Sequence, residues 1–600
     1  MAFGFGGQGG KAAVGEPRVS DVVPRDGTMR ALWRLLVPFW VSREWWKAWG
    51  LLLLQLVLIG VNTWTAVWFN NWIGDFTQSI VNYDLAGIGR LLVRLCWIAL
   101  AVTLLAVITV YARAALKILW RKFLTEYFLE RWTHANRFYR IELEGLVDNP
   151  DQRISQDVNQ FIEQSTTLII GGIGTVVGAV TFGALLWGLS GVLHVSMFGH
   201  EWSIKGYVLY ASIAYSIIIT VAAYVFGRRL MPLTFEQEHR EADFRFQLAG
   251  VREYAEQIAL YHGGEAERRQ GRTVFRALLD NLWRIVFFNM RFESFTELVG
   301  FVTTVIPMVL ALPQYFAHQI AFGTITRMGG AFQQLNGALS WFVNNFSQIQ
   351  LYRATIARLD QLDWATRVGL EGDFIAVRAG DGDAIIGEDL RLDTPDGRVL
   401  VTASGFSIGP GERWLIQGRS GAGKSTLMRA LAGIWPYGCG SISLPQGRRF
   451  LFLSQRNYIP RGTLKAAICY PAKPELFDDE LCEEILIRCE LPRYVRNLYK
   501  EDRWSHRLSP GEQQRASIAR VLIQRPDFVL LDESTSALDG ETERKLYQAM
   551  IDELPGSTFV SISHHDTLNE FHTRILRVLD DGRLEIRAMT PAQGQAGERN

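Results

Sequence analysis

The first half of the chain is a succession of long apolar runs separated by charged stretches. Five runs approach the length of about 20 residues that crosses a bilayer; they are residues 49–69, 95–112, 166–189, 207–227 and 298–316. A sixth run, residues 328–352, carries no charge but is rich in Gln, Asn and Ser. One such run could be a buried helix of a soluble protein, but six in succession predict a membrane bundle.

Basic residues beside these runs predict their orientation. They gather before the first run and after the second and fourth runs: Arg30, Arg34, Arg43, Lys47, Arg113, Lys117, Arg121, Lys122, Arg228 and Arg229. Because positive connections stay on the cytoplasmic side, we expect both termini inside. Tryptophans among basic residues predict an interfacial helix over residues 29–49. The connections 113–163 and 228–293 are expected to extend the spans as helices.

The sixth run has a polar face whose members recur in steps of three and four: Gln333, Asn336, Ser340, Asn344 and Ser347. Residues at this spacing share one side of a helix, and polar groups are costly against lipid. We therefore expect this face to line a wet cavity or to bond to another helix. Glu297, one turn after Glu293 at the start of the fifth run, is a further cavity candidate. Near a helix N-terminus, either carboxylate could instead only favour the helix dipole.

The second half changes at about residue 385 to short β-rich runs, turns and helices. A predicted strand, residues 414–417, runs into a glycine-rich loop and then a predicted helix, residues 426–433. The loop and the first helical residue are Gly418, Arg419, Ser420, Gly421, Ala422, Gly423, Lys424, Ser425 and Thr426. This strand–loop–helix pattern predicts a phosphate-binding loop for ATP, whose backbone N–H groups wrap the phosphates. We expect Lys424 to reach the β and γ phosphates and Ser425 to bind Mg²⁺.

Two carboxylates, Asp532 and Glu533, follow the apolar strand predicted at 528–531. An acidic pair at a strand end is often only a helix cap. Downstream of a phosphate loop, however, the pair favours hydrolysis, with Asp532 in the Mg²⁺ shell and Glu533 polarising the attacking water.

Several further segments resemble the motifs of the ABC transporter superfamily. The run Leu508-Ser509-Pro510-Gly511-Glu512-Gln513 is similar to the signature motif, with Pro510 where many members have glycine. Gln455 matches the Q-loop glutamine, Asp539 the D-loop and His564 the switch histidine, with His565 as the adjacent alternative. The resemblance implies that Ser509, Gly511 and Glu512 contact the nucleotide of a second cassette. It also implies that Gln455 joins the Mg²⁺ site and that Gln455 and His564 serve catalysis with Glu533. The family's adenine-stacking aromatic is missing from residues 392–397, which leaves base preference open.

Composition argues against nucleic acid as a partner, and the changes along the chain suggest domain boundaries. Lys and Arg number 62 against 61 Asp and Glu, so no charge excess indicates nucleic acid. The five cysteines show neither metal spacing nor a disulfide framework. We expect a tail at 1–28, a transmembrane domain at 29–360, a linker at 361–384, a cassette at 385–588 and a second tail at 589–600. The predicted fold is a membrane α-helical bundle of the exporter type followed by an α/β P-loop NTPase.

The membrane half indicates which branch of the superfamily the chain resembles. Residues 148–154 (Asp-Asn-Pro-Asp-Gln-Arg-Ile) and 339–344 (Leu-Ser-Trp-Phe-Val-Asn) are similar to segments of the BacA/SbmA-related permeases and their cassette-fused relatives. The peroxisomal fatty-acyl transporters share the first segment more loosely. This implies a homodimer in a bacterial inner membrane that takes up peptides, peptide-like antibiotics or cobalamin. An exporter of lipids, acyl-CoA or drugs and a membrane-anchored regulatory ATPase are the alternatives.

Overall fold

The computed structural model describes residues 27–197, 200–227, 230–367, 375–563 and 566–588. The chain divides into two compact units. Met1–His134 and Leu146–Arg367 form the first unit, and Ala135–Gly145 and Val368–Asn600 form the second. The predicted tails fall outside the described residues, apart from Gly27 and Thr28.

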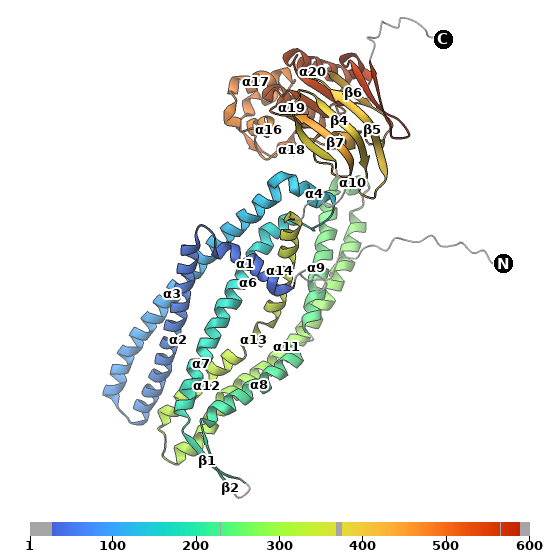
Figure 1. Ribbon diagram of the computed structural model, residues 1–600. Coiled ribbons are helices and arrows are strands. Elements are labelled where there is room, and N and C mark those ends of the chain that lie inside the picture. Colours follow the sequence, from blue (N-terminus) through green and yellow to red (C-terminus); the bar gives the residue numbers. More distant parts are fainter. Residues whose placement is uncertain (1–26, 198–199, 228–229, 368–374, 564–565, 589–600) are drawn as a thin grey trace, which may run out of the picture. The chain divides into compact units, whose positions relative to one another are not determined.

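The first unit is a bundle of long helices (Figure 1). Its long members are α2 (Trp45–Val81), α3 (Leu85–Thr133), α7 (Gly171–Leu189), α8 (Tyr207–Gly227), α9 (Leu230–Glu253), α11 (Gly264–Phe316), α12 (Phe322–Leu339) and α14 (Phe346–Arg367). Shorter pieces are α1 (Thr28–Trp40), α5 (Pro150–Gln152), η3 (Arg153–Asp157), α6 (Val158–Ser165), η4 (Thr166–Ile170), α10 (Ala255–Leu260) and α13 (Trp341–Asn344). The connections 113–163 and 228–293 are largely helical, as expected from their composition.

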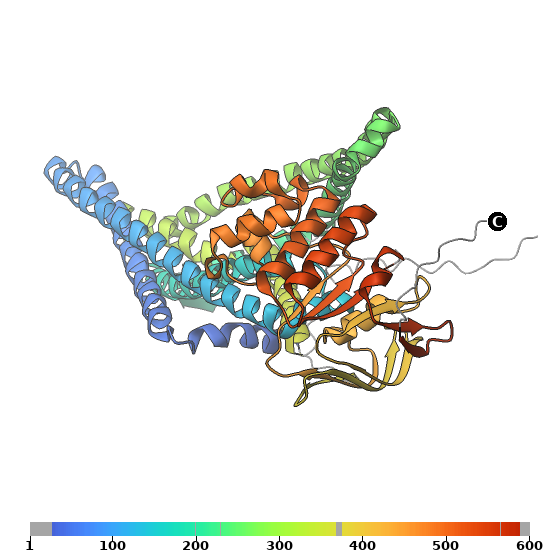
Figure 2. The same ribbon diagram turned by 90° about the horizontal axis from the view of Figure 1, so that it is seen from above.

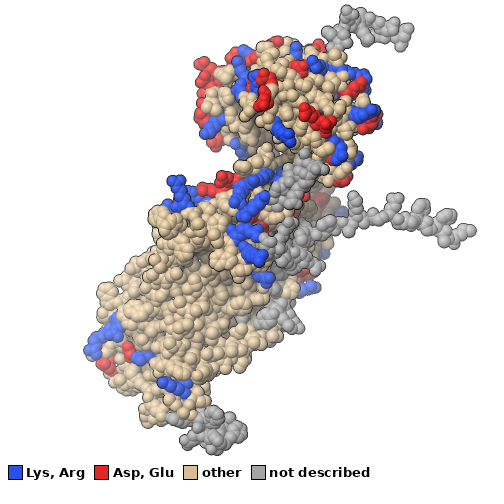
Figure 3. All heavy atoms as spheres, viewed as in Figure 1, with Lys and Arg blue, Asp and Glu red and all other residues tan. Residues whose placement is uncertain are grey.

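Four described helical segments are long and apolar enough to cross a membrane: Trp45–Val81, Leu85–Leu143, Pro150–Leu189 and Gly264–Phe316. Tyr207–Ala223 is a shorter apolar helix. On the face seen in Figure 3, a broad band of this unit carries no Lys, Arg, Asp or Glu. Such a surface suits the hydrocarbon core of a bilayer, so this unit is the membrane part of the protein.

The sixth predicted span differs from the expectation of one helix. It consists of α12, α13 and α14, with interruptions at Ser340 and Asn345. Gly337 and the Asn344–Asn345 pair have weak helix propensity. The carbonyl oxygen of Trp341 accepts both from the backbone N–H of Asn345 at 3.0 Å and from its side-chain Nδ2 at 2.9 Å.

A β-hairpin that the hydrophobic pattern did not predict joins α7 to α8. Its strands, β1 (Val192–Met197) and β2 (His200–Lys205), pair antiparallel from Val192 with Lys205 to Met197 with His200.

The second unit contains two main sheets (Figure 1). The six-stranded sheet has the order β14-β13-β6-β12-β11-β8 and the four-stranded sheet the order β3-β7-β4-β5. The strands are β3 (Ala376–Gly380), β4 (Ile385–Asp393), β5 (Val399–Ile408), β6 (Arg413–Gln417), β7 (Gly438–Pro445), β8 (Phe450–Leu453), β11 (Phe528–Asp532), β12 (Thr558–Ile562), β13 (Arg574–Val578) and β14 (Leu584–Ala588). A short pair, β9 (Gly462–Thr463) and β10 (Glu501–Asp502), lies apart from them. The predicted linker 361–384 thus contains the end of α14 and all of β3.

The helices of the second unit complete an α/β domain. They are α4 (Arg137–Leu143), α15 (Lys424–Leu431), α16 (Leu464–Cys469), α17 (Asp479–Arg488), α18 (Trp504–Arg507), α19 (Pro510–Gln524) and α20 (Gly540–Glu553), with the short turns η5 (Pro474–Leu476), η6 (Pro492–Asn497) and η7 (Asp566–Phe571). Figure 2 shows α16, α17 and α19, in orange, grouped beside the yellow strands. One core, with Trp504 and Tyr547, lies under these helices, and a second core, with Trp414 and Phe528, lies between the sheets.

Candidate nucleotide site and membrane cavity

Four neighbouring parallel strands deliver the candidate nucleotide-site residues to one edge of the large sheet. Strand β12 pairs in parallel with β6 on one side and with β11 on the other, and β11 pairs in parallel with β8. The carboxyl ends of these strands therefore meet at one edge. In open α/β sheets, this edge is where ligands bind.

The phosphate-binding loop follows β6, whose residues Trp414–Ile416 are buried. Gly421 and Gly423 have φ of +79° and +97°, a region that favours glycine. The Nζ of Lys424 donates to the carbonyl oxygens of Gly418 at 2.8 Å and Arg419 at 3.0 Å, so the lysine spans the loop. Burial lowers the pKa of Lys424, against the opposing charges of Glu533 and Asp532.

The remaining loop positions differ in exposure. Residues Arg419, Ser420 and Gly421 are exposed and Ala422 is half-buried, whereas Lys424 and Thr426 are buried. Gly423 precedes the first residue of α15, so the phosphates would meet the N-terminus of that helix, where N–H groups favour negative charge.

Asp532 and Glu533 lie where β11 ends. The hydroxyl of Ser425 donates to Asp532 Oδ1 at 3.0 Å, and burial raises the pKa of Asp532, although the bond from Ser425 opposes the shift. Glu533 has φ of +48°, a conformation uncommon for a residue other than glycine and typical of functional sites. Gln455 Nε2 donates to Glu533 Oε2 at 2.8 Å. The structure thus brings together five predicted residues from three parts of the sequence.

The oxygen donors at this edge fit Mg²⁺. Ser425, Asp532 and Gln455 offer hydroxyl, carboxylate and amide oxygens, the hard ligands that Mg²⁺ prefers alongside water and phosphate. Among the described residues, no group of three or more His, Cys, Asp and Glu could hold a metal. When bound, Mg²⁺ would offset the negative charge of those phosphates.

The signature segment forms the start of α19. The hydroxyl of Ser509 accepts from the Glu512 N–H at 3.4 Å, and Glu512 Oε2 accepts from the Ser509 N–H at 2.9 Å, a reciprocal cap. Pro510 takes the first helical position, where its missing N–H costs little. The departure from glycine therefore leaves the helix start intact.

The predicted contact of Glu512 with a second cassette stays a prediction, because within its own chain this residue has several bonds. Its side chain is buried, and its carboxylate also accepts from Arg493 and from the Tyr494 hydroxyl at 3.3 Å. Burial alone would raise its pKa, but the bonds from Ser509 and the charge of Arg493 bring the pKa below its usual value. Ser509 is exposed and Gly511 half-buried, so these two residues remain the outward-facing part of the signature.

The other predicted motif residues have separate positions. Asp539 caps α20, because its Oδ1 accepts from the backbone N–H groups of Glu541 at 3.2 Å and Thr542 at 3.0 Å. The bond from Thr542 is the main reason why the pKa of Asp539 is lowered. His564 and its alternative His565 lie outside the described residues. In the region without a stacking aromatic, Trp435 donates to the Asp393 carbonyl at 3.0 Å but is itself buried.

Sequence reasoning missed that Ala135–Gly145 belongs to the cassette unit. Ile141 is fully buried, and Leu143 packs against the core that contains Trp414. The structure shows a break before this segment, where Ala135 and Asn136 have φ of +51° and +57°. That break ends α3 and starts α4, a helix too short for the membrane.

Comparison with known proteins agrees with this geometry. The family model described as ABC transporter transmembrane region 2 matches residues 32–316, and the model described as ABC transporter matches residues 401–536. An ABC transporter ATP-binding protein of Synechocystis is 34% identical over 79% of this chain and 72% of its own length. The chain belongs to the ABC transporter family. It combines a membrane region with an ATP-hydrolysing cassette.

Two further relatives of this ABC transporter carry more specific names. The inner membrane ABC transporter ATP-binding protein YddA of Escherichia coli is 30% identical over 88% of this chain and 94% of its own length. The human lysosomal cobalamin transporter ABCD4 is 28% identical over 78% of this chain and 81% of its own length. The Escherichia coli relative supports an inner-membrane protein.

In the membrane region of the transporter, the apolar side of α12 packs into the bundle. Phe332 and Leu335 are buried in a cluster with Phe182 and Leu186 of α7 and Val208 of α8. A Cβ added at Gly171 or Gly172 of α7 would lie 3.6 Å from the Trp341 ring, so α13 also packs closely on α7. These contacts fix which side of the sixth predicted span faces its own chain.

The polar side of the same segment is exposed or half-buried. Gln333, Asn344 and Ser347 are exposed, and Asn336 and Ser340 are half-buried. The Ser340 hydroxyl donates to Asn336 Oδ1 at 3.4 Å. The buried Nδ2 of Asn336 has no hydrogen-bond partner in the described part of the chain.

Glu297 is exposed on α11, and one polar contact places its side of α11 next to this face. Gln333 Nε2 donates to the hydroxyl of Thr304 at 3.4 Å. Thr304 lies seven residues after Glu297, and this spacing brings both to one side of the helix. Glu297 is therefore on the side of α11 that adjoins the polar face.

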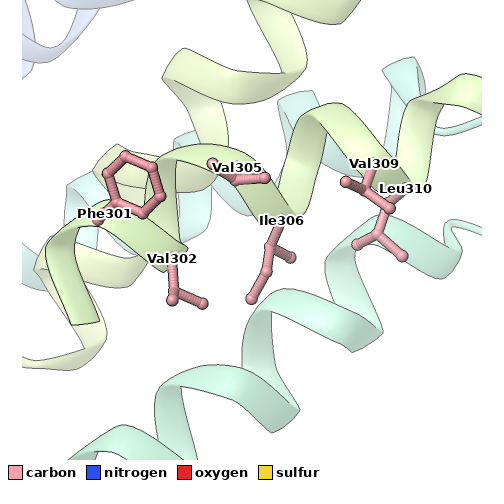
Figure 4. Close-up of a pocket in the computed structure, with 6 residues that line it drawn as sticks. All are labelled: Phe301, Val302, Val305, Ile306, Val309 and Leu310. Carbon is pink, nitrogen blue, oxygen red and sulfur yellow. The ribbon is translucent and has the colours of Figure 1, made fainter. Parts of the chain in front are cut away.

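An apolar pocket of about 280 Å³ lies farther along α11. It is lined by Phe301, Val302, Val305, Ile306, Val309 and Leu310. Figure 4 shows Val302 and Ile306 pointing to the same side of the helix. This lining offers no polar group to a hydrophilic solute.

Proposed function

We propose that this ABC transporter acts as a homodimer that takes up hydrophilic solutes such as peptides, peptide-like antibiotics or cobalamin. The main observation in support is the exposed polar face of α12, α13 and α14, together with the two interruptions at Ser340 and Asn345. At membrane depth, irregular backbone is tolerated only where protein buries it or where it lines water. A second copy that faces this surface would enclose a polar cavity.

In this proposal, each described motif has a role in the ATP hydrolysis that drives transport through the cavity. Lys424 and the N–H groups of the loop would hold the phosphates, and Ser425, Asp532 and Gln455 would hold Mg²⁺. Glu533 would accept the proton of the attacking water, with Gln455 orienting its carboxylate through their bond. Ser509 and Gly511 would close over the nucleotide bound by the other copy. Two complete composite sites would form in the dimer.

The solute class draws support from the relatives as well. The human relative is named a lysosomal cobalamin transporter, and cobalamin and peptides both need hydrogen-bonding partners inside a membrane protein. Both termini are proposed to be cytoplasmic because of the positive flanks of the spans.

The second candidate function is export of lipids, acyl-CoA or drugs. The apolar pocket on α11 favours it, because that lining would suit an alkyl chain rather than a peptide. The two candidates differ in which surface the solute touches. Substitutions on the polar face should matter for the first, and substitutions at Val302 or Ile306 should matter for the second.

The deciding experiment measures entry of labelled cobalamin and a labelled proline-rich peptide into cells that produce the transporter. We expect uptake of at least one solute with the wild-type chain. Glu533→Gln should abolish that uptake together with ATP turnover, by about 10²-fold or more in rate, because a proton-handling group is lost. Glu541→Gln, at an exposed glutamate of α20, is the matched control and should keep both.

Failure would take recognisable forms. If neither solute enters but ATP turnover responds to lipids, the exporter is favoured. If ATP turnover responds to no solute at all, the regulatory ATPase is favoured. Uptake that continues in Glu533→Gln would refute ATP-driven import.

A further inference from the structure

A buried carboxylate outside the recognised motifs lies beside the nucleotide edge. Glu543 is in the first turn of α20, and its side chain is fully buried. Burying a carboxylate is costly unless hydrogen bonds compensate it. Both oxygens are engaged: the Thr535 hydroxyl donates to Oε1 at 2.6 Å, and the Thr567 hydroxyl donates to Oε2 at 2.5 Å.

The two threonines come from different catalytic connections. Thr535 is two residues after Glu533, in the segment that leaves β11. Thr567 is in η7, in the segment that leaves β12. Because β11 and β12 are adjacent and parallel, their connections emerge side by side at the nucleotide edge. One carboxylate therefore ties these two connections together.

Packing at the start of α20 reinforces the same link. A Cβ added at Gly540 would lie 3.5 Å from Thr567 Cγ2, and Asp539 caps this helix. One turn after Glu543, the Tyr547 hydroxyl bonds to Ser561 of β12 and lies 3.0 Å from His572 Nε2. The inner side of α20 is thus held against β12 and the segment that follows it.

The signature helix holds the other side of the segment after β11. Gln514 of α19 is buried, and its Oε1 accepts from the Ala537 N–H at 2.9 Å. Its Nε2 donates to the Ser536 hydroxyl at 3.3 Å. The segment 533–539 is therefore anchored to α19 at Ser536 and Ala537 and to α20 at Thr535.

From this arrangement we infer that Glu543 is a positioning residue for ATP hydrolysis, which sets the place of Glu533 by fixing Thr535 against Thr567. The inference rests on the proposed catalytic role of Glu533. Glu533 has a strained φ of +48°, and such a conformation persists only when the surroundings over-determine it. The bond from Thr535 to Glu543, two residues away, supplies part of that constraint.

A positioning role predicts an effect on turnover rather than on nucleotide binding. Misplacing a reacting group by about 1 Å can cost about 10²-fold, and the two hydrogen bonds described for Glu543 go to Thr535 and Thr567 rather than to the loop that holds the phosphates. Thr535→Val removes the hydroxyl with little change in shape. We expect kcat to fall between about 10- and 100-fold, with KM for ATP within about two-fold of the wild type.

The test measures ATPase kinetics and thermal unfolding of the full-length protein for four variants. Thr535→Val and Thr567→Val each remove one donor, and Thr535→Ser restores the hydroxyl. Thr573→Val, at an exposed threonine whose hydroxyl bonds only to the Arg413 carbonyl among the described contacts, is the matched control. We expect low kcat in the first two variants, recovery in Thr535→Ser and wild-type values in Thr573→Val.

Two results would overturn the inference. The first is a lower unfolding temperature for Thr535→Val and Thr567→Val with wild-type kcat per folded molecule, which would make Glu543 a stabilising residue only. In that case Glu533→Gln, assayed in parallel, would still lack turnover, and the proposed catalytic role would stand. The second is normal turnover in Glu533→Gln, which would remove the catalytic role itself and the positioning role with it.

Discussion

At the residue scale, the cassette depends on the side chains at the ends of its strands and also on buried side chains that pack against those strands. His572 is buried behind β12: its Nδ1 lies 2.7 Å from the Leu568 carbonyl oxygen and its Nε2 lies 3.1 Å from the Ser561 hydroxyl. Burial lowers its pKa from 6.5 to about 4. The ring is therefore neutral at pH 7 and braces the strand without adding charge.

This depressed pKa predicts a pH dependence of stability. Between pH 6.5 and about 4 the unfolded chain binds a proton at His572 that the folded chain does not. Stability from this group is fully present above pH 6.5 and falls as the pH decreases towards 4, by on the order of 3 kcal/mol. Denaturant unfolding of the cassette at several pH values should show this loss.

Substitution separates His572 from the other titrating groups. His572→Gln should be less stable at pH 7.5 but should lose less additional stability between pH 6.5 and 4 than the wild type. His506→Gln, at an exposed position, should follow the wild-type profile. Identical acid profiles for the wild type and His572→Gln would contradict the assignment.

At the element scale, the sixth predicted span matters because it is not one helix. The apolar side of α12 is fixed by Phe332 and Leu335, and α13 is fixed by Trp341 against Gly171 and Gly172. The polar side between Gln333 and Ser347 is left facing outward. This side cannot face lipid without cost, so it must face either a water-filled cavity or another helix. An experiment can distinguish these two possibilities.

Single cysteines on the polar side test this arrangement. In a Cys96→Ser, Cys439→Ser background, which removes the two cysteines that are not buried, Asn336→Cys, Ser340→Cys and Asn344→Cys should react with a membrane-impermeant thiol reagent. ATP trapping should change the side from which they react. Phe332→Cys, on the buried side, should stay unreactive.

Replacement by leucine completes the test. Asn336→Leu, Ser340→Leu and Asn344→Leu should lower solute uptake while basal ATPase stays near the wild-type rate. If the cysteines stay unreactive in every nucleotide state and the leucine variants unfold, the polar side serves helix packing. A hydrophobic substrate would then be favoured.

At the scale of the whole molecule, the proposed homodimer would build each nucleotide site from two chains. Lys424, Ser425, Asp532, Glu533 and Gln455 gather at the sheet edge, whereas Ser509 and Gly511 belong to the start of α19 and face outward. Since the Glu512 carboxylate is engaged within its own chain, we expect the serine and the glycine to make the contact with a second copy. A second copy is the simplest source of the missing half.

Mixed dimers test the sharing of sites. Lys424→Ala and Ser509→Arg chains should each be nearly inactive as homodimers, because every site carries one lesion. In a mixed dimer, one composite site carries both lesions and the other carries none. Mixing the two variants should therefore restore part of the ATPase rate, to at most about half of the wild-type rate per mixed dimer if the two sites work independently.

The ATPase rate of the mixture is compared with that of each variant mixed only with itself. Mixing Lys424→Ala chains with one another provides the matched control and should restore nothing. Full activity of either variant alone, or normal hydrolysis by a stable monomer, would contradict the shared site.

The hydrophobic pattern and the residue spacing along the sequence were enough to predict the membrane helices, the phosphate loop and two strand ends. The apolar runs specify membrane helices because their length matches a bilayer, and the glycine pattern specifies the phosphate loop because only certain φ values let backbone N–H groups converge. Strand ends at Asp532 and Ile562 were also readable from short apolar runs. Each of these features depends on neighbours in sequence.

Other features depend on contacts between distant segments, and only the tertiary structure decided them. The pairing of β8, β11, β12 and β6 brought Gln455 to Glu533, and the packing of α20 made Glu543 a bridge between Thr535 and Thr567. The inward turn of Glu512 and the place of Ala135–Gly145 in the cassette unit have the same origin. A sequence gives the polarity of such residues, but the partners that satisfy a buried carboxylate come from the fold.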